Sequence, residues 1–412
     1  MNSLHIVGGG LSGITAALLA HKAGHRDTII YERAEALGGV ARSTLCGEFE
    51  VRTGTLYFGD TTDPQLALLQ SYGSDFTAFP NQFGSINPHE TGKPFYTDSF
   101  GGPVIPCGQN ITLFPNKQAN LYERLSQYPP NIAMRMLALA RKHVDVDPVT
   151  LSAEAVIPMA LNRLIPLDAD AANLARLKSQ APLYDDLYGL PRNSWGYARN
   201  QIAHLPTDGF LTFFSQLEET LTHLGITCSF RKLLRPAQAE HLIKKGDSVF
   251  WGVNPLPLFP YLGIPVPETV QKTFYVYSFL AESSLTSPYY LQSFLPHGSI
   301  FRLYIYSSGP AKIVTLECMQ PATEVELRSE VSELINDTPI ADLQMGENIA
   351  SVRQARWLYH STETISALKS LRSKLSDRFG TAFLCGNWED YAKGAKYTGL
   401  QKTLTQWAGQ AV

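Results

Sequence analysis

Three glycines near the amino terminus have the spacing of a dinucleotide-binding turn. Gly8, Gly10 and Gly13 fill the positions of a G-x-G-x-x-G motif. Apolar runs at 4–7 and 14–19 flank them, so the motif lies between a predicted strand and a predicted helix. There the first glycine permits a tight turn, the second admits a pyrophosphate to the helix N-terminus, and the third allows close helix–strand packing. The pattern predicts a Rossmann-type nucleotide-binding unit.

An acidic residue follows at the distance that ribose recognition requires. Glu32 comes after another apolar run at 28–30, about 20 residues beyond the glycines, where a carboxylate accepts hydrogen bonds from ribose hydroxyls. The first part of the predicted cofactor site comprises Gly8, Gly10, Leu11, Ser12, Gly13, Glu32 and Arg33.

A second glycine motif bears on which dinucleotide is bound. Residues 37–43 have the sequence Leu-Gly-Gly-Val-Ala-Arg-Ser, with Gly38 and Gly39 as a doublet. This segment resembles the second glycine motif of the superfamily of FAD-binding amine oxidases, protoporphyrinogen oxidases and UDP-galactopyranose mutases. The resemblance implies that the doublet lets the chain pass close to the cofactor, with Arg42 and Ser43 near its phosphate or flavin end. It favours FAD as cofactor, with NAD(P)H as a candidate transient reductant.

Composition narrows the class of protein. A chain of 412 residues predicts two or three domains, and a net charge of −3 gives no electrostatic reason to expect nucleic acid or an acidic membrane as partner. No apolar run approaches the roughly 18 residues needed to span a bilayer. The first strand begins too early for a signal peptide to precede it.

The cysteines and histidines show no pattern of a structural site. The five cysteines are scattered and never paired as C-x-x-C, and the ten histidines lack ligand spacing. We therefore expect no disulfide framework, no metal, and a reducing compartment, the cytoplasm. The sequence leaves the oligomeric state open.

The order of the predicted helices and strands indicates an α/β fold. It would comprise a discontinuous FAD-binding Rossmann-like domain, a helical insertion and an antiparallel β-sheet substrate domain. Alternating strands are predicted at 274–280, 289–294 and 300–307, and a last parallel strand at 383–387. The predicted division is 1–75 for the first part of the FAD domain, 76–117 for a β-hairpin region over the flavin, 118–182 for the helical insertion, 183–240 for a loop, helix and strand returning to the FAD domain, 241–330 for the substrate domain and 331–412 for the last part of the FAD domain.

Short segments along nearly the whole chain resemble those of UDP-galactopyranose mutases, in the same order. They are 50–58, in the place of a histidine-bearing loop beside the flavin, then 113–116, 188–196, 206–210, 299–302 and 386–391. The resemblance implies further cofactor residues: Thr55, Leu56, Tyr57, Gly386, Asn387 and Tyr391. The chain departs from the family in having no histidine at 53–58 and Asn387 in place of an arginine, and it lacks the downstream Tyr-x-Asp pattern.

The resemblance implies chemistry on a nucleotide-linked sugar. In the mutases a reduced flavin attacks the anomeric carbon through N5 as the nucleoside diphosphate leaves, and the sugar recloses in the other ring size. Arginine offers a fixed fork of donors to a diphosphate, and tyrosine adds a phenolic donor. Because side chains alternate along a strand, Arg302 and Tyr304 share one face. The candidate substrate residues are Arg302, Tyr304, Arg192, Arg199, Trp195, Tyr275, Tyr277 and Tyr391.

Two other functions compete with the mutase. One is an oxidoreductase of the amine oxidase type, in which the oxidised flavin takes hydride from a C–N or C–C bond. That chemistry requires an aromatic cage and usually a lysine near N5, and the sequence assigns no lysine to that role. The other is a flavin-bound partner protein without turnover. In each case we expect the ligand site between the Rossmann-like domain and the sheet at 274–307.

Overall fold

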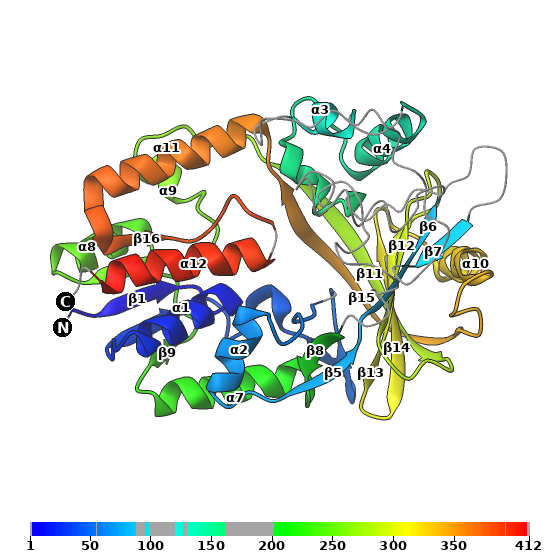
Figure 1. The fold of residues 1–412 in the computed structure, drawn as a ribbon, viewed down its shortest axis with the longest axis horizontal. Helices are drawn as coiled ribbons and strands as arrows, with labels where there is room; N and C mark the ends of the chain where they lie inside the picture. The colour runs from blue at the N-terminus through cyan, green and yellow to red at the C-terminus, as the bar shows by residue number, and fades with distance from the viewer. Residues whose placement is uncertain are drawn as a thin grey trace.

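The computed structural model describes residues 2–54, 56–87, 95–98, 120–126, 130–161, 202–391 and 393–409. Two sheets lie side by side, each with its own helices (Figure 1). The amino terminus lies at the far end of the smaller sheet, whose strands run from there toward the second sheet. The carboxyl ends of these parallel strands therefore face the junction of the two parts, which is where α/β proteins place their ligands.

The smaller sheet is parallel throughout and is assembled from distant segments. Its order is β16-β10-β1-β2-β9, with β1 at Leu4–Val7, β2 at Thr28–Tyr31, β9 at Thr227–Ser229, β10 at Ser248–Trp251 and β16 at Phe383–Cys385. Apart from the edge strand β9, its strands are short and largely apolar, as expected when helices cover both faces of a parallel sheet. The predicted discontinuous Rossmann-like domain is confirmed, since its last strand comes from near the carboxyl terminus.

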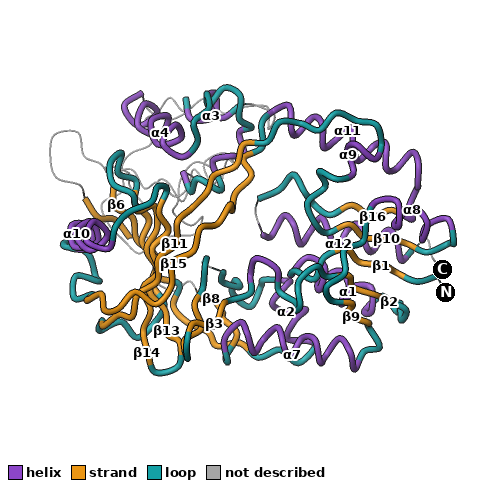
Figure 2. The backbone as a smooth tube through the Cα atoms, turned by 180° about the vertical axis from the view of Figure 1, so that it is seen from behind, coloured by secondary structure: helices purple, strands orange, loops and turns teal. Residues whose placement is uncertain are grey.

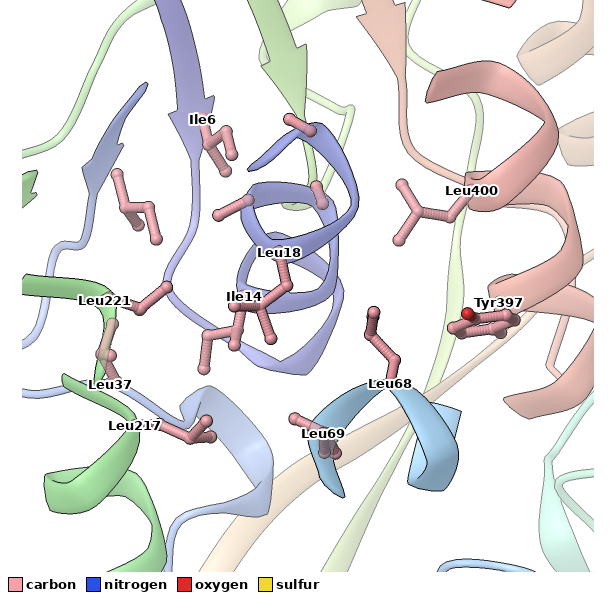
Figure 3. Close-up of a cluster of buried hydrophobic side chains, with 14 of the residues drawn as sticks. Ile6, Ile14, Leu18, Leu37, Leu68, Leu69, Leu217, Leu221, Tyr397 and Leu400 are labelled. Atoms are coloured by element: carbon pink, nitrogen blue, oxygen red, sulfur yellow. The ribbon is translucent and has the colours of Figure 1, made fainter. Parts of the chain in front are cut away.

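Helices cover the two faces of the parallel sheet in separate groups. One group comprises α1 at Leu11–Lys22, α2 at Pro64–Ser71, α7 at Gly209–His223 and α12 at Lys393–Ala408. The other comprises α8 at Pro236–Lys244, α9 at Leu258–Tyr261 and α11 at Thr362–Phe379. Figure 3 shows Leu69 of α2, Leu217 of α7 and Leu400 of α12 around Ile14 of α1. The helix that carries the glycine motif is thus the buried centre of its layer.

The second sheet has seven strands in the order β15-β11-β14-β13-β12-β6-β7. Their bounds are β6 Gln82–Asn87, β7 Phe95–Asp98, β11 Val270–Glu282, β12 Tyr289–Ser293, β13 Ile300–Ser308, β14 Ala311–Cys318 and β15 Gln344–Tyr359. The predicted antiparallel strands are present, but β12 pairs with β6 in parallel, so the sheet is mixed. A parallel pair is possible there because a long stretch of chain connects the two strands.

One strand crosses the predicted domain division. The boundary at 331 assigned 344–359 to the FAD domain, whereas β15 pairs with β11 along the edge of the second sheet. Helix α10 at Glu324–Ile335 also packs on that sheet. Figure 2 shows β15 and β11 running together out of the second sheet toward α11. The chain therefore returns to the parallel sheet at α11, where β15 ends.

Smaller elements connect the two sheets. They are the hairpin of β3 at Thr44–Cys46 and β4 at Phe49–Val51, the pair of β5 at Phe76–Pro80 and β8 at Ile202–Pro206, and the helices α3 at Leu121–Leu125 and α4 at Pro130–His143. Short 3₁₀ turns lie at Gly39–Ala41 (η1), Ala153–Val156 (η2) and Gly380–Ala382 (η5). The described part of the helical insertion, α3, α4 and η2, lies over one end of the second sheet (Figure 1).

Candidate functional site

The first glycine loop has the backbone geometry that its motif predicts. Gly8 has a φ of 105°, and a Cβ there would lie 2.4 Å from Val253 Cγ1. A Cβ at Gly13 would lie 1.8 Å from the Gly8 carbonyl oxygen, so the helix meets the strand too closely for any side chain. Gly10 differs, because a Cβ there would find no heavy atom closer than 4.0 Å. The open space that a pyrophosphate requires thus lies beside Gly10.

The N-terminus of α1 is open to an anion. Gly10 is its N-cap, with no side-chain cap and no acidic residue in the first turn. The N–H groups of Leu11, Ser12 and Gly13 have no acceptor within the helix, because a helix leaves its first donors unpaired. These donors and the helix dipole favour a phosphate. The residues present therefore fit the pyrophosphate of a dinucleotide.

The glycine doublet lies directly against this loop. Gly38 donates its N–H to the Gly9 carbonyl oxygen at 2.9 Å, and its φ of 117° is a conformation that favours glycine. A Cβ on Gly38 would lie 2.7 Å from the ring of Phe214 on α7, and one on Gly39 would lie 3.3 Å from Gly10 Cα. The two glycine motifs therefore form one cradle.

Glu32 has a structural role in that cradle, and its predicted contact with a ribose stays a prediction. Its carboxylate accepts the Gly9 N–H at 2.7 Å and the Ala34 N–H at 2.7 Å, through different oxygens. Each oxygen keeps a second lone-pair direction. Glu32 can therefore hold the glycine loop and still accept ribose hydroxyls.

The other predicted residues near the doublet have different surroundings. Arg42 donates to the Leu37 carbonyl oxygen at 3.2 Å. The Ser43 hydroxyl is buried with no hydrogen-bond partner, and Arg33 is exposed. Only Arg42 is thus fixed by a hydrogen bond to this motif.

The predicted flavin loop at 53–58 leads from β4 to a buried contact with β8. Phe58 forms a two-bond bridge with His204, whose ring nitrogen Nδ1 lies 2.7 Å from the Gly59 carbonyl oxygen. The loop has no histidine of its own, yet the fold places one beside it. Leu56 packs against the buried core of the α1 face, and Thr55 lies outside the described residues.

Tyr57 lines a cavity of about 500 Å³ between the N-termini of α2 and α12. Asp63, the N-cap of α2, is among its lining residues and accepts the Gln65 and Leu66 N–H groups. Tyr397 of α12 lines the opposite side. Burial, followed by the charge of Asp63, raises the pKa of Tyr397.

Two of the predicted cofactor residues, Gly386 and Asn387, directly follow β16. A Cβ on Gly386 would lie 2.8 Å from the Trp251 carbonyl oxygen, so this residue passes close to β10. Asn387 donates from Nδ2 to Asp390 at 2.6 Å and to the Ala395 carbonyl oxygen at 3.2 Å. The amide of Asn387, where the sequence resemblance places an arginine, thus ties the β16 loop to α12.

Tyr391 faces His360 rather than an open space. Its hydroxyl accepts the His360 N–H at 2.6 Å, and the two rings stack 5.0 Å apart. Burial raises the pKa of Tyr391. The phenol is therefore engaged in joining the end of β15 to the loop before α12.

Arg302 lies on the predicted face of β13, but a carboxylate neutralises it. The guanidinium is 3.4 Å from Glu317 on β14, and the two side chains are 9% and 0% exposed. Arg302 also donates to Gln292 at 3.3 Å and to the Pro158 carbonyl oxygen at 3.3 Å. A guanidinium held in this way has little capacity left for a diphosphate.

Tyr304 lies on the same face of β13 as Arg302, as strand alternation predicts. Its contacts are with β4 and the residue that follows it. Its hydroxyl donates to the Arg52 carbonyl oxygen at 3.0 Å, and its ring packs with Val51 of β4. The phenol therefore positions the backbone that leads into the 53–58 loop.

Tyr275 and Tyr277 lie on the opposite face of the second sheet. The register pairs them with Cys318 and Leu316, and they pack in the cluster that α10 covers. Tyr277 also accepts the Ala322 N–H at 3.2 Å. The structure therefore does not bring them together with Arg302, because residues paired across a ladder share one face. Arg192, Trp195 and Arg199 lie outside the described residues.

Arg52 is a charged residue at the junction that the sequence analysis did not select. Its guanidinium lies 5.4 Å from the Phe210 ring on α7 and 4.6 Å from the Tyr306 ring on β13. It is thus held between the two parts of the molecule. Its position at the start of the 53–58 loop was the signal available in the sequence.

Comparison with known proteins supports the fold. A family model described as an NAD(P)-binding Rossmann-like domain matches residues 6–72. No curated protein matches the sequence. The segment that carries both glycine motifs is therefore similar to that nucleotide-binding domain.

Solved structures match along the whole chain at low identity. Reduced UDP-galactopyranose mutase has a TM-score of 0.66 at 14% identity, covering 99% of this chain and 94% of its own. A candidate protoporphyrinogen oxidase from Exiguobacterium sp. 255-15 has 0.62 at 13%, covering 99% of both chains. Cyclohexylamine oxidase from Brevibacterium oxydans IH-35A has 0.57 at 13%, covering 100% and 99%. The chain therefore has a fold of the flavin amine oxidase type.

Two searches of the described residues add no further kind of site. Within them, no helix has both the length and the apolar character needed to cross a membrane. Nor does this part of the chain hold three or more histidine, cysteine or carboxylate side chains placed to bind a metal ion.

Proposed function

We propose that this protein is an FAD-dependent enzyme whose substrate binds between the parallel sheet and the second sheet. The observation that carries the proposal is the double glycine cradle, in which Gly38 hydrogen-bonds Gly9 beside the uncapped N-terminus of α1. The family model at 6–72 and the whole-chain likeness to flavoenzymes support it.

The chain's own residues would divide the work of holding the cofactor. Donors at the N-terminus of α1 bind the pyrophosphate, and Glu32 accepts the ribose hydroxyls while it holds Gly9. The remainder of the cofactor would extend toward the second sheet, which the carboxyl ends of the strands face (Figure 1). Bound flavin supplies a nitrogen that accepts hydride when oxidised or acts as a nucleophile when reduced.

For the reaction we favour a mutase-like isomerisation of a nucleotide-linked sugar, including ring contraction. The likeness to reduced UDP-galactopyranose mutase covers nearly both chains. The protein must then bind a diphosphate as it leaves and returns, and keep water from the reacting carbon. Arg302 is engaged with Glu317, so the binding charge has to come from another residue.

An amine oxidase-like oxidoreductase is the second candidate, and Lys396 on α12 favours it. Surrounding protein lowers the pKa of Lys396 by desolvation, against the opposing charge of Asp390, although the side chain is exposed. A lysine desolvated by neighbouring protein loses its proton more readily than one in open water. Such an amine could accept a proton from an amine substrate.

Two parallel assays test the proposal. Purified protein is reconstituted with FAD and its flavin absorbance is measured. One sample is then reduced with dithionite under anaerobic conditions and incubated with a panel of nucleotide sugars, whose products are separated by chromatography. The other is incubated in air with primary and secondary amines while hydrogen peroxide is measured.

The outcomes separate the candidates. Isomerised nucleotide sugar formed only by reduced protein supports the mutase, and peroxide from an amine supports the oxidase. Flavin binding without either product supports a partner protein without turnover. A chain that takes up no FAD contradicts the whole proposal.

A further inference from the structure

The surroundings of Arg52 include two aromatic rings. Its guanidinium lies 5.4 Å from the ring centre of Phe210, near the start of α7, and 4.6 Å from that of Tyr306 on β13. The backbone is fixed as well, because Arg52 donates its N–H to the Tyr306 hydroxyl at 2.8 Å and accepts the Tyr304 hydroxyl at 3.0 Å. Aromatic faces stabilise a cation without using its hydrogen-bond donors. The guanidinium is therefore held in place with donors to spare.

The Arg52 guanidinium has no ion-pair partner among the described residues. Arg52 Nε is buried with no hydrogen-bond partner, and no carboxylate in the described part of the chain forms an ion pair with the guanidinium. Glu50 is close enough to act on Tyr306 electrostatically, but one of its oxygens accepts the Phe210 N–H at 2.8 Å. A partly desolvated cation without an acceptor attracts any anion that can reach it.

The guanidinium lies near the cofactor cradle. Phe210 is one helical turn before Phe214 on α7, and their rings are 6.3 Å apart. The ring of Phe214 in turn lies under Gly38, where a Cβ would be 2.7 Å away. Two ring contacts therefore connect Arg52 with the glycine doublet. Since Arg52 is only half-buried, part of its side chain reaches solvent at the junction of the two sheets.

From this geometry we propose that Arg52 binds an anionic group of the substrate, a phosphate or a carboxylate, at the junction of the two parts. The inference deepens the proposed function and rests on it. Arg52 takes the anion-binding role that the sequence analysis gave to Arg302, because the charge of Arg302 is paired with Glu317. The planar guanidinium presents two parallel donors, so it would grip either anion through two oxygens.

Calorimetric titration of the FAD-loaded protein tests the assignment. The probes are inorganic pyrophosphate and succinate, because FAD already fills the cradle at α1 and leaves only other anion sites free. Arg52→Gln removes the charge, and Arg52→Lys keeps the charge without the fork. Arg26→Gln is the matched control, since Arg26 is exposed and lies between α1 and β2, at the amino end of the parallel strands and away from the junction.

We expect Arg52→Gln to weaken binding of the preferred probe roughly tenfold to a hundredfold while flavin content stays at the wild-type level. Arg52→Lys should recover part of the loss, and Arg26→Gln should match the wild type. Stronger binding of pyrophosphate indicates a phosphate-bearing substrate, and stronger binding of succinate a carboxylate. If Arg52→Gln fails to fold, equal binding by Arg52→Lys and wild type contradicts the two-donor grip.

Three results would overturn the assignment. The first is wild-type protein that binds neither probe, and the second is equal binding by wild type and Arg52→Gln. The third is loss of FAD from the Arg52 variants, which would make Arg52 a cofactor residue. If the wild-type chain takes up no FAD, the proposed function fails, and the same titration in a Gly10→Val background, where the cradle is blocked, still tests Arg52.

Discussion

Gly10 and Gly13 lie in the same turn, yet their surroundings predict different results of substitution. Gly10→Val should leave folding intact, because a Cβ there has open space and the φ of −75° suits any residue. It should abolish FAD binding by filling the space of the pyrophosphate. Gly13→Ala should prevent folding, because its Cβ would lie 1.8 Å from the Gly8 carbonyl oxygen.

Thermal melting and flavin absorbance of the reconstituted proteins distinguish these effects. Gly394→Ala serves as the control for adding a methyl group, since no atom lies within 4 Å of a Cβ there and its φ is not positive. A Gly10→Val protein that retains the wild-type flavin content would show that the cradle is elsewhere.

Substitution of Arg302 should lower the stability of the fold and should not act specifically on substrate affinity. Arg302→Met should lower the free energy of unfolding by about 3 kcal/mol, because it removes the cation beside the buried Glu317 carboxylate. Adding Glu317→Gln should restore part of that loss, since a neutral amide does not need the cation. Urea denaturation of both single variants and the double variant measures this coupling. Strictly additive effects would contradict a direct ion pair.

At the scale of elements, one carboxylate joins three helices on the far face of the parallel sheet. Glu240 of α8 accepts hydrogen bonds from Lys244, from Tyr261 of α9 and from Arg378 of α11. These donors lower the pKa of Glu240 to about 2, and burial together with Glu240 raises the pKa of Tyr261 to about 12. The cluster therefore holds α8, α9 and α11 together while Glu240 is ionised.

Glu240→Gln should lower the free energy of unfolding by about 1 kcal/mol at pH 7, a modest loss because Lys244 and Arg378 are solvent-exposed. Since the pKa of Glu240 is lower in the folded state, its contribution is complete above its ordinary value of 4.5 and disappears as the pH falls toward about 2. The difference between variant and wild type should shrink over that interval. Denaturation at pH 7, 4 and 3 measures it, with exposed Glu219→Gln as control.

At the scale of the whole molecule, contacts from one short strand, β4, help to connect the two parts. Residues of β4 and its exit make hydrogen bonds to β13: the Glu50 N–H to Ser308, and the Arg52 backbone to Tyr304 and Tyr306. The predicted cofactor loop at 53–58 begins where these contacts end. Ligand binding at this junction should therefore stabilise both parts together.

FAD at about 100 times its dissociation constant should raise the free energy of unfolding by about 2.7 kcal/mol and increase the melting temperature in a single transition. Differential scanning calorimetry with and without FAD measures the shift, and Gly10→Val should show none. A shift confined to one of two separate transitions would show that the two parts unfold independently.

Much of the geometry of the two glycine motifs was predictable because it is local. The turn at Gly8, the close approach at Gly13 and the left-handed doublet at Gly38 each follow from residues a few positions apart, and the structure has them where the spacing placed them. The position of Glu32 was also predictable, because one strand–helix–strand unit fixes its distance from the glycines. Local conformation depends on neighbouring residues, which the sequence shows directly.

The surroundings of the residues predicted to bind a substrate depended on pairings between distant segments. Glu317 lies opposite Arg302 only because β14 aligns with β13 in one register, and that register places Tyr275 and Tyr277 under α10. Arg52 is held between Phe210 and Tyr306, which come from two different parts of the fold. Strand alternation says which residues share a face, but not which face meets a partner or what charge lies across it. Those relations arise only when distant strands pair, helices cover the sheet and the two parts pack together, so tertiary structure alone decided them.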